Sequence, residues 1–221
     1  MTISLLSDIY PALLKEIHRP PKALYCRGNT ELLTKQCITI VGTRNATSYG
    51  KKILDIFLKP YLNTLGICIV SGMARGIDTL VHSRCLELGI PTIAVIAGGI
   101  ENIYPTSNTQ LYEDICKSGL VISEFDGVVA MKKGMFPMRN RILAGLSEVT
   151  IVVEAGVKSG SLITANLALE SGRDVYVVPG DIFKNTSCGC NKLIKEGAGV
   201  IGCEEDFEQI FGIEHDQLKM I

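Results

Sequence analysis

The chain has 221 residues and a mass of 24.0 kDa, which suits one large domain with a short extension better than two full domains. Apolar residues make up 47% of it and charged residues 20%, a balance that excludes a disordered chain. No apolar run approaches the roughly 18 residues that a membrane helix needs. The first residues lack the basic start of a signal peptide, so we expect a cytoplasmic protein with no membrane partner.

The formal net charge of −1 is unevenly distributed along the chain. Residues 201–221 hold six acidic residues and one lysine, so this tail carries a net −5 and the preceding 200 residues carry +4. The body of the chain is therefore mildly basic, which is compatible with a nucleic-acid partner.

The eight cysteines indicate neither disulfides nor a metal site. Cys37 and Cys68 lie inside apolar runs, where cysteine behaves as a small hydrophobe. Cys188 and Cys190 form a C-x-C pair, whereas zinc sites favour C-x₂₋₄-C pairs. We therefore predict reduced thiols, no resident metal and no cofactor.

Residues 1–36 contain Pro11, Pro20 and Pro21 and are predicted to form a short helical extension packed on a core domain of residues 37–221. Within that domain, β-branched runs begin roughly every 25 to 30 residues, the length of a βαβ unit. These runs are 37–41, 67–70, 92–96, 120–122, 149–153 and 174–178. Because they are continuously apolar, they indicate strands buried on both faces of a parallel sheet.

Helical patterns fill the intervals between these runs. Residues 50–65 are predicted to form an amphipathic helix, 76–88 a second helix, and 161–171 a third with Ser161 as its N-cap. The acidic tail has room for a last helix. Strands that alternate with helices predict an α/β fold with a Rossmann-like, doubly wound and mostly parallel sheet.

Glycine-rich turns follow several of the predicted strands. One strand ends in Gly42-Thr43-Arg44, others are followed by 71–76 (SGMARG), 98–99 (GG) and 154–161 (EAGVKSGS). Parallel strands place such turns at one edge of the sheet, where ligands bind, and glycine lets backbone N–H groups approach an anion. With Arg44 and Arg75 among them, the turns predict a phosphate-binding crevice.

The common nucleotide-binding sequences are not found. The next glycine after Gly42 is Gly50, so the G-x-G-x-x-G fingerprint fails, and there is no Walker A sequence. An ordinary NAD enzyme or P-loop ATPase is therefore not expected.

Residues 131–141 (MKKGMFPMRNR) carry four basic side chains, no acidic one and a single aromatic ring, Phe136. Cations beside an exposed ring suit single-stranded nucleic acid, because the charges contact phosphates and the ring stacks on a base. The same residues also suit a solvated loop in which Phe136 packs on the core. Taken alone, they do not decide between these two interpretations.

Six motifs follow one another along the chain: Gly42-Thr43-Arg44, SGMARGID (71–78), YP..N (Tyr104, Pro105, Asn108), FPMRNRILAGLS (136–147), SGSLITA (159–165) and GRDVYVVPG (172–180). Through them, from about residue 10 to 202, the chain resembles the DNA processing protein A family (DprA, also called Smf). The resemblance implies a Rossmann-like protein that binds single-stranded DNA without sequence preference, forms homodimers and has no catalytic turnover. It also implies protection of incoming DNA and loading of the RecA recombinase in natural transformation.

The resemblance further implies a DNA-binding site. Arg44 would contact backbone phosphate, Phe136 would meet a base, and the start of the 161–171 helix would complete the pocket. The full predicted set is Gly42, Arg44, Arg75, Lys133, Phe136, Arg139, Asn140, Arg141, Ser159, Gly160 and Ser161, with Asn140 and Arg75 in supporting positions.

The chain also departs from the family. Many members carry an N-terminal helical domain and a C-terminal winged-helix-like domain, and we expect neither in full here. Where the family commonly has Gly-Thr-Asn, this chain has Gly189-Cys190-Asn191. The sequence does not show which surface forms the dimer. The candidates are the last strand and the apolar residues of 200–212 (Ile201, Phe207, Ile210, Phe211).

The alternative hypothesis is a nucleoside-monophosphate-processing enzyme of the lysine-decarboxylase-like (LOG) type, whose fold is similar and whose hallmark is a PGGxGTxxE run. The nearest segment, 154–165 (EAGVKSGSLITA), lacks the Pro-Gly-Gly start and the second carboxylate. Asp78, His82 and Glu154 are its candidate acid/base residues, although a helix surface pair and a carboxylate that anchors the arginine-rich loop are simpler explanations. A nucleotide-sensing module is a third possibility, but it has no need for Phe136 among four bases.

Overall fold

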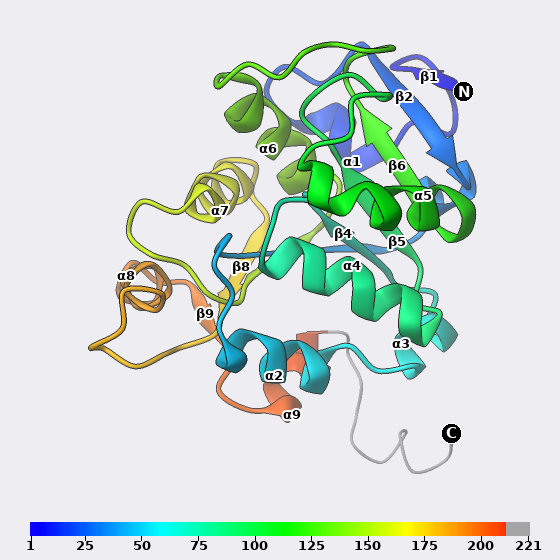
Figure 1. Cartoon of the computed structure of the whole chain (residues 1–221). Coiled ribbons are helices and arrows are strands. Elements are labelled where there is room, and N and C mark those ends of the chain that lie inside the picture. The colour runs from blue at the N-terminus through cyan, green and yellow to red at the C-terminus, as the bar shows by residue number, and fades with distance from the viewer. Residues whose placement is uncertain (211–221) are drawn as a thin grey trace.

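A computed structural model describes residues 1–210 and shows one mixed sheet with helices on both faces (Figure 1). The sheet has nine strands in the order β1-β2-β6-β5-β4-β3-β7-β8-β9. In chain order these are β1 (Thr2–Ser4), β2 (Ala23–Gly28), β3 (Cys37–Val41), β4 (Cys68–Ser71), β5 (Thr92–Val95), β6 (Leu120–Ser123), β7 (Val149–Val152), β8 (Asp174–Val177) and β9 (Gly199–Val200). In the order of the sheet, every pair of neighbouring strands from β6 through β5, β4, β3, β7 and β8 to β9 is parallel. This confirms the Rossmann-like, mostly parallel fold.

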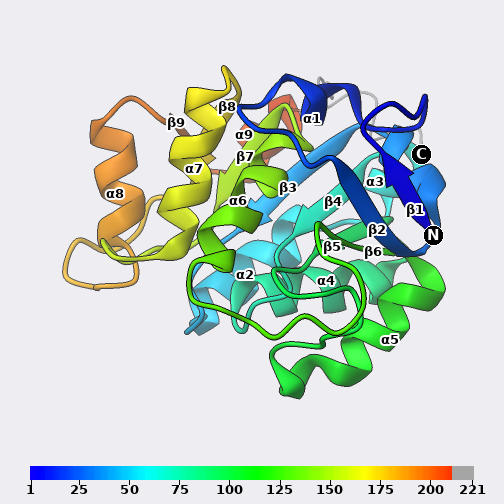
Figure 2. The same cartoon turned by 90° about the horizontal axis from the view of Figure 1, so that it is seen from above.

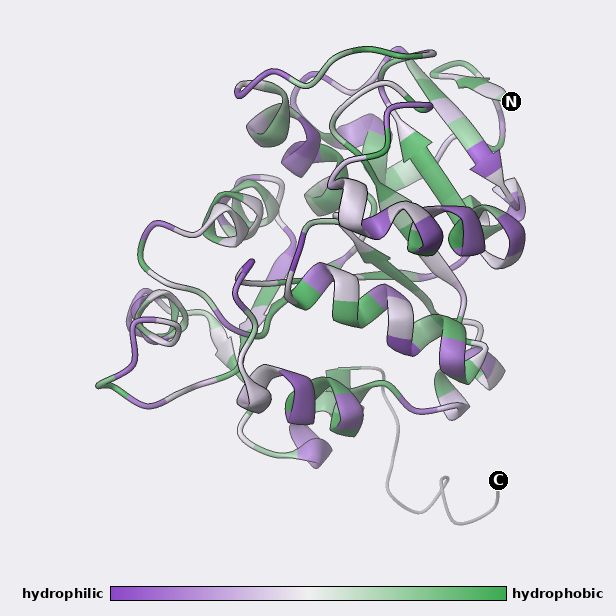
Figure 3. Cartoon of the chain, viewed as in Figure 1, coloured by the Kyte–Doolittle hydropathy of each residue, from purple (hydrophilic) through white to green (hydrophobic). Residues whose placement is uncertain are grey.

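Two layers of helices enclose the sheet (Figure 2). The helices are α1 (Ala12–Glu16), α2 (Ser48–Phe57), α3 (Tyr61–Thr64), α4 (Ile77–Leu88), α5 (Thr109–Ser118), α6 (Met135–Gly145), α7 (Gly160–Glu170), α8 (Cys188–Lys195) and α9 (Glu204–Ile210), with short 3-10 turns at Thr30–Thr34 and Thr106–Asn108. Buried residues of α1, α6, α7 and α8 form the core on one face, and those of α2, α3, α4 and α9 form the core on the other. Figure 3 shows hydrophobic residues gathered on the central strands. The sheet is therefore doubly wound, as the alternation of patterns predicted.

The predicted helical character of residues 1–36 is incomplete. This segment does contain α1, but β1 and β2 also extend the sheet, with β2 antiparallel to β6. The strand signal of β2 is weak because its six residues, ALYCRG, alternate between more and less buried positions and end in two exposed residues. Three prolines around it also suggested irregular structure.

Two helix predictions need correction at their ends. The predicted 50–65 helix is two helices, because Pro60 cannot donate an amide hydrogen bond and its ring clashes with a continuing helix. The helix predicted to begin after Ser161 begins at Gly160, and its N-cap is Ser159, whose hydroxyl accepts a hydrogen bond from the amide of Ser161. The first difference is a break within the predicted helix, and the second moves the N-cap by two residues.

The sheet has a switch point between β3 and β7. From β3 the chain adds β4, β5 and β6 on one side, and it then returns to place β7 on the other side of β3. Val41 and Val152, at the carboxyl ends of these strands, lie opposite each other. The turns after β3 and β7 must therefore separate, and a crevice forms between them.

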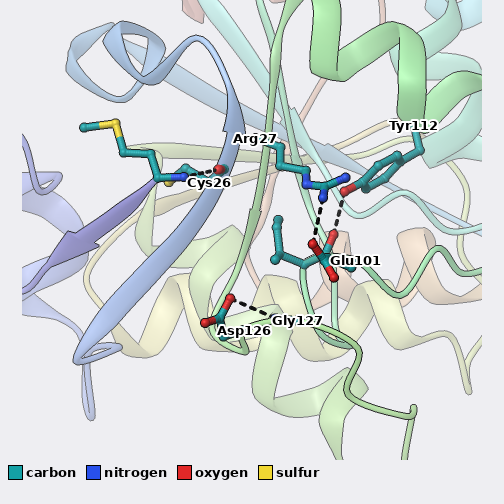
Figure 4. Close-up of polar contacts among 8 residues, drawn as sticks. Cys26, Arg27, Glu101, Tyr112, Asp126 and Gly127 are labelled. Carbon is teal, nitrogen blue, oxygen red and sulfur yellow. Dashed lines mark hydrogen bonds and ion pairs between the residues drawn. The ribbon is translucent and has the colours of Figure 1, made fainter.

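Polar contacts fix the loop between β5 and α5 (Figure 4). The guanidinium of Arg27 on β2 lies 2.8 Å from the carboxylate of Glu101, and the hydroxyl of Tyr112 on α5 donates a 2.5 Å hydrogen bond to the carbonyl of Ile100. Asn102 Nδ2 donates to the carbonyl of Val129 at 2.7 Å. Contacts from β2, from α5 and from the segment around Val129 therefore fix this loop.

The apolar residues proposed for a dimer surface belong to the core instead. Ile201 is 2% exposed and Phe207 is fully buried. The ring of Phe207 stacks on that of Phe57 with centroids 4.2 Å apart. Ile210 packs against the same cluster, and Phe211 lies outside the described residues. Within residues 1–210, every helix is too short or too polar to cross a bilayer.

We predict that Phe207→Ala lowers the free energy of unfolding by about 3–5 kcal/mol, because it empties a fully packed position. Leu169→Ala, at a site that is 50% exposed, should change it by less than about 0.5 kcal/mol. Urea denaturation of the two variants measures both values. A Phe207→Ala protein that keeps its stability but changes its oligomeric state would contradict this assignment.

Candidate nucleic-acid interface

Two cavities adjoin each other at the carboxyl edge of the sheet. The larger, of about 630 Å³, lies between the turn after β3, helix α6 and the start of α7, and we call it the α7 groove. Its polar and aromatic lining consists of Thr43, Arg44, Asp78, Lys133, Phe136, Arg139, Asn140, Lys158, Ser159, Ser161 and Thr164, with Gly42, Gly156 and Gly160 between them. The smaller, of about 330 Å³, lies toward the β5 loop, and we call it the β5 pocket.

The side chains of Arg44 and Phe136 form the wall between the two cavities, and both line each of them. The guanidinium carbon of Arg44 lies 5.2 Å from the centre of the Phe136 ring, within the range of a cation–π contact. Tyr104 meets the same ring edge-on, with centroids 5.9 Å apart and planes at 62°. Arg44 is exposed and Phe136 is partly exposed, so a cation and a ring face the same solvent-filled space.

The N-terminus of α7 opens into the α7 groove. Ser159 caps it, and the hydroxyls of Ser159 and Ser161 lie 2.7 Å apart. Asn140 Nδ2 donates a 3.2 Å hydrogen bond to the carbonyl of Gly160, which ties α6 to this turn. Because a helix N-terminus presents N–H groups and a partial positive charge, this end of the groove favours an anion.

Two exposed lysines, Lys133 and Lys158, also line the α7 groove. Lys133 belongs to the predicted set. Lys158 and Thr43 do not, although both lie in glycine turns that the sequence analysis had identified. Lys158 could have been predicted from the sequence, because it is a basic residue in the glycine-rich turn that precedes α7. Among the residues that line this groove in the described chain, Asp78 is the single acid.

Arg139 has a structural position rather than an open one. It is 7% exposed, and its Nη1 donates to the carbonyls of Gly72 and Val95 at the ends of β4 and β5. Burial lowers the pKa of Arg139 to about 10, against the opposing effect of Asp78. Burial likewise raises the pKa of Asp78 to about 6, although Arg139 and backbone amides pull it down. Arg139 therefore forms the floor of both cavities and holds two strand ends.

Arg141 does not line the groove, in contrast to the prediction. Its Nη2 lies 2.5 Å from Glu124 Oε1, in an ion pair whose side chains are 17% and 22% exposed. The prediction treated 131–141 as a loop, in which neighbouring bases can face one ligand. In the structure the helix α6 begins at Met135, and the helical period directs Arg141 away from Phe136 and Asn140.

The candidate acid/base residues of the enzyme hypothesis are all buried, so Asp78 and His82 do not form a helix surface pair. His82 is fully buried, and its Nδ1 lies 2.8 Å from the hydroxyl of Thr92. Glu154 is 3% exposed and accepts hydrogen bonds from the amide and hydroxyl of Thr47, at 2.9 and 2.6 Å. Both oxygens of the Glu154 carboxylate accept hydrogen bonds from Thr47. Glu154 therefore fixes the start of α2 rather than the arginine-rich segment.

The remaining predicted residues line one of the two cavities. Gly42, Ser159, Gly160 and Ser161 line the α7 groove, and Arg75 is exposed at the β5 pocket. Within the described part of the chain, no group of three or more His, Cys, Asp or Glu residues is placed to hold a metal ion. Cys188, Cys190 and Cys203 are free thiols.

The fold and the site together define a Rossmann-like protein with a basic, aromatic-walled crevice at the switch point of its sheet. The sequence model of the DNA recombination-mediator protein A family matches residues 1–212, and the chain belongs to this family. DNA processing protein DprA of Bacillus subtilis (strain 168) is 46% identical over 211 residues, which cover 95% of this chain and 71% of that protein. Membership of a family of recombination mediators, which are not enzymes, removes the nucleotide-processing alternative.

Solved structures agree with this assignment. DprA from Streptococcus pneumoniae superposes with a TM-score of 0.91 at 40% identity, over 97% of this chain and 75% of that one. A structure of DprA from Helicobacter pylori that concerns its single-stranded DNA binding mode has a TM-score of 0.85 at 32% identity, over 100% and 97%. A molybdenum cofactor binding protein from Rippkaea orientalis, at 15% identity and a TM-score of 0.55, shares the fold alone.

We predict that Gly76→Ala destabilises the protein more than Gly66→Ala, because only Gly76 lies against the Arg44 turn. Both glycines have positive φ, +79° and +71°, so each substitution strains the backbone by at least about 1–2 kcal/mol. Gly76 also has ψ −126°, which lies outside the left-handed region that other residues can enter. A Cβ on Gly76 would lie 2.3 Å from the carbonyl oxygen of Thr43, whereas one on Gly66 meets nothing within 4 Å. Denaturant unfolding should show about 1–3 kcal/mol of additional loss at Gly76. Equal losses of stability in the two variants would mean that the turn after β3 moves aside for the new Cβ at no cost.

We predict that His82 makes stability depend on pH below 6.5. Burial lowers the pKa of His82 from 6.5 to about 3, so in this window the unfolded chain binds a proton that the folded protein does not. Stability is therefore lost as the pH falls, by up to about 1.4 kcal/mol per pH unit. Asp78 acts in the opposite direction between 3.8 and about 6, since its pKa is raised.

Unfolding free energies of wild type and His82→Gln, measured from pH 4 to 7.5, isolate this contribution. The free energy of unfolding of His82→Gln should fall less steeply than that of the wild type as the pH decreases below 6.5. Asp78→Asn is the matched control and should make the loss steeper. Parallel curves for wild type and His82→Gln would show that folding leaves the pKa of His82 unchanged.

Proposed function

We propose that this protein binds single-stranded DNA without sequence preference in the α7 groove, protects the bound strand, and helps to load RecA recombinase onto it. The observation that carries the proposal is the exposed Arg44–Phe136 pair, which stands beside the open N-terminus of α7. The binding mode described for the Helicobacter pylori relative, and the recombination-mediator family itself, support it.

The groove supplies the two kinds of contact that a single strand needs. Lys133, Lys158 and the first turn of α7 offer positive charge to the phosphates. Phe136 offers a π-surface to a base, and every base has a face that can stack there. A base enters such a cavity only when it is not paired and stacked in a duplex, so the groove favours a single strand.

The lining contains little that could read a base edge. The amide of Asn140, which is buried, is engaged with the carbonyl of Gly160, and the guanidinium of Arg139 with the carbonyls of Gly72 and Val95. Contacts to phosphate and stacking on a ring carry almost no information about base identity. Binding that tolerates any sequence follows, because these two side chains are already engaged and the remaining contacts are to phosphate and to the face of a base.

Dimer formation and RecA loading require surfaces outside the groove. Since Ile201 and Phe207 are buried, the edge strand β9 with Val200 and the loop with Ile182 and Phe183, which are 73% and 90% exposed, are the candidates for these contacts. Sedimentation of the free protein gives its oligomeric state. RecA filament formation on a strand already bound by this protein tests the loading step.

Titration of labelled oligo-dT at two salt concentrations, with matched duplex as competitor, tests the central claim. We predict tight, salt-sensitive binding that duplex does not displace. Arg44→Ala or Lys133→Ala should weaken binding to all sequences alike and reduce the slope of log K against log salt by about 0.7 for each lost phosphate contact. Lys117→Ala is the control, because this exposed lysine on α5 lies outside both cavities. An unchanged slope in both groove variants, or no binding by the wild type at low salt, would refute the proposal.

A further inference from the structure

We propose that the β5 pocket receives a base of the same DNA strand, with Tyr104 as a second stacking surface next to Phe136. This inference rests on the proposed single-stranded DNA binding and extends it beyond the α7 groove. The YP..N motif, which the function described so far does not use, supplies the residue that carries it.

The β5 pocket has the lining expected for a base. Tyr104 is 50% exposed and stands at its wall. Ile96, Ala97, Pro105 and Met131 supply an apolar part of the lining, and Arg75 adds an exposed guanidinium. Its volume of about 330 Å³ is at the small end of ligand pockets, which suits one base better than a larger ligand.

The position of the pocket makes it a continuation of the α7 groove. Arg44, Ala74, Phe136 and Arg139 line both cavities, so a strand that stacks on Phe136 from one side is adjacent to the β5 pocket on the other. Tyr104 approaches the Phe136 ring edge-on at 62°. The two rings therefore do not stack face to face, and Tyr104, which is 50% exposed, keeps ring surface for a neighbouring base.

The charge of the pocket fits a nucleic acid. None of the residues that line it in the described chain is acidic, and two of them, Arg44 and Arg75, are exposed arginines. The acidic residue in the same loop, Glu101, is paired with Arg27 at 2.8 Å. Phosphates on either side of a base in this pocket would therefore meet positive charge.

The tyrosine stands on a rigid support. Its loop is fixed by the contacts of Ile100 and Glu101 (Figure 4) and by that of Asn102 with Val129. Four residues after Tyr104, the Nδ2 of Asn108 donates to the carbonyl of Met73 at 3.0 Å and to the hydroxyl of Thr79 at 2.9 Å. Asn108 thus joins the Tyr104 loop to the turn after β4, which carries Arg75. A ring held in this way loses little entropy when a base stacks on it.

The first experiment compares the affinities of variants for oligo-dT. Tyr104→Ala should raise Kd about tenfold, as expected for the loss of one base stack, while Tyr104→Phe should bind like the wild type. Tyr49→Ala is the matched control, because Tyr49 is similarly exposed at 38% and lies outside both cavities. Its Kd should not change.

A double variant separates direct stacking from an indirect effect on Phe136. If the two rings contact different bases, the double variant should bind oligo-dT more weakly than Phe136→Ala alone, although the two effects need not be additive because the rings touch. If Tyr104 only supports Phe136, the double variant should bind no more weakly than Phe136→Ala alone. The second result would overturn the inference.

Photo-crosslinking of the wild type gives a readout that does not depend on any variant folding. An oligo-dT that carries 5-iododeoxyuridine at successive positions should crosslink to Tyr104 at one position and to Phe136 at a neighbouring one, as located by mass spectrometry. Crosslinks to Phe136 without any to Tyr104, together with wild-type affinity of Tyr104→Ala, would overturn this inference and leave the proposed function intact. Failure of the wild type to bind any oligonucleotide would instead refute the proposed function.

Discussion

The buried guanidinium of Arg139 is the interaction on which the site depends. A charge in a closed interior is tolerated only where hydrogen bonds and an opposite charge compensate for the lost water. Here the carbonyls of Gly72 and Val95 and the nearby Asp78 provide that compensation. Because these groups belong to three different elements, α6 can satisfy its arginine in one position only. Phe136, almost one turn earlier on the same helix, is placed at the crevice as a result.

The same arrangement explains how a protein with a net charge near zero can present a basic surface. Several of its acidic residues take part in internal contacts, as Glu154 does with Thr47 and Glu124 with Arg141, and six lie in the tail after residue 200. The exposed cations of the switch point are left without acidic neighbours at close range. Local placement of charge, rather than its sum, sets the potential in the two cavities.

Sequence patterns predicted the parts of the fold that depend on local composition. The strands from β3 to β7 are buried, mostly apolar runs, and such runs have few other stable positions in a globular protein. Strand β2 was not predicted, because its pairing with β6 is set by a partner almost a hundred residues away. The register of distant strands is a tertiary property that a short window does not contain.

The site residues show the same division. Arg44, Lys133 and Phe136 were recognised by residue type and motif, and the structure brings them together. Arg139 and Arg141, only two residues apart, could not be told apart until the helical phase of α6 was known, since one is directed into the sheet edge and the other toward Glu124. Tyr104 was part of a recognised motif, but its approach to Phe136 depends on a loop that folds back from β5.

The shortness of the two outermost strands limits how copies of this protein can associate. β1 has three residues and β9 has two, so neither edge offers a ladder long enough to template a continuous sheet between molecules. Any self-association at these edges has to rely on side chains rather than on backbone pairing. The fold therefore resists open-ended fibrous assembly at high local concentration.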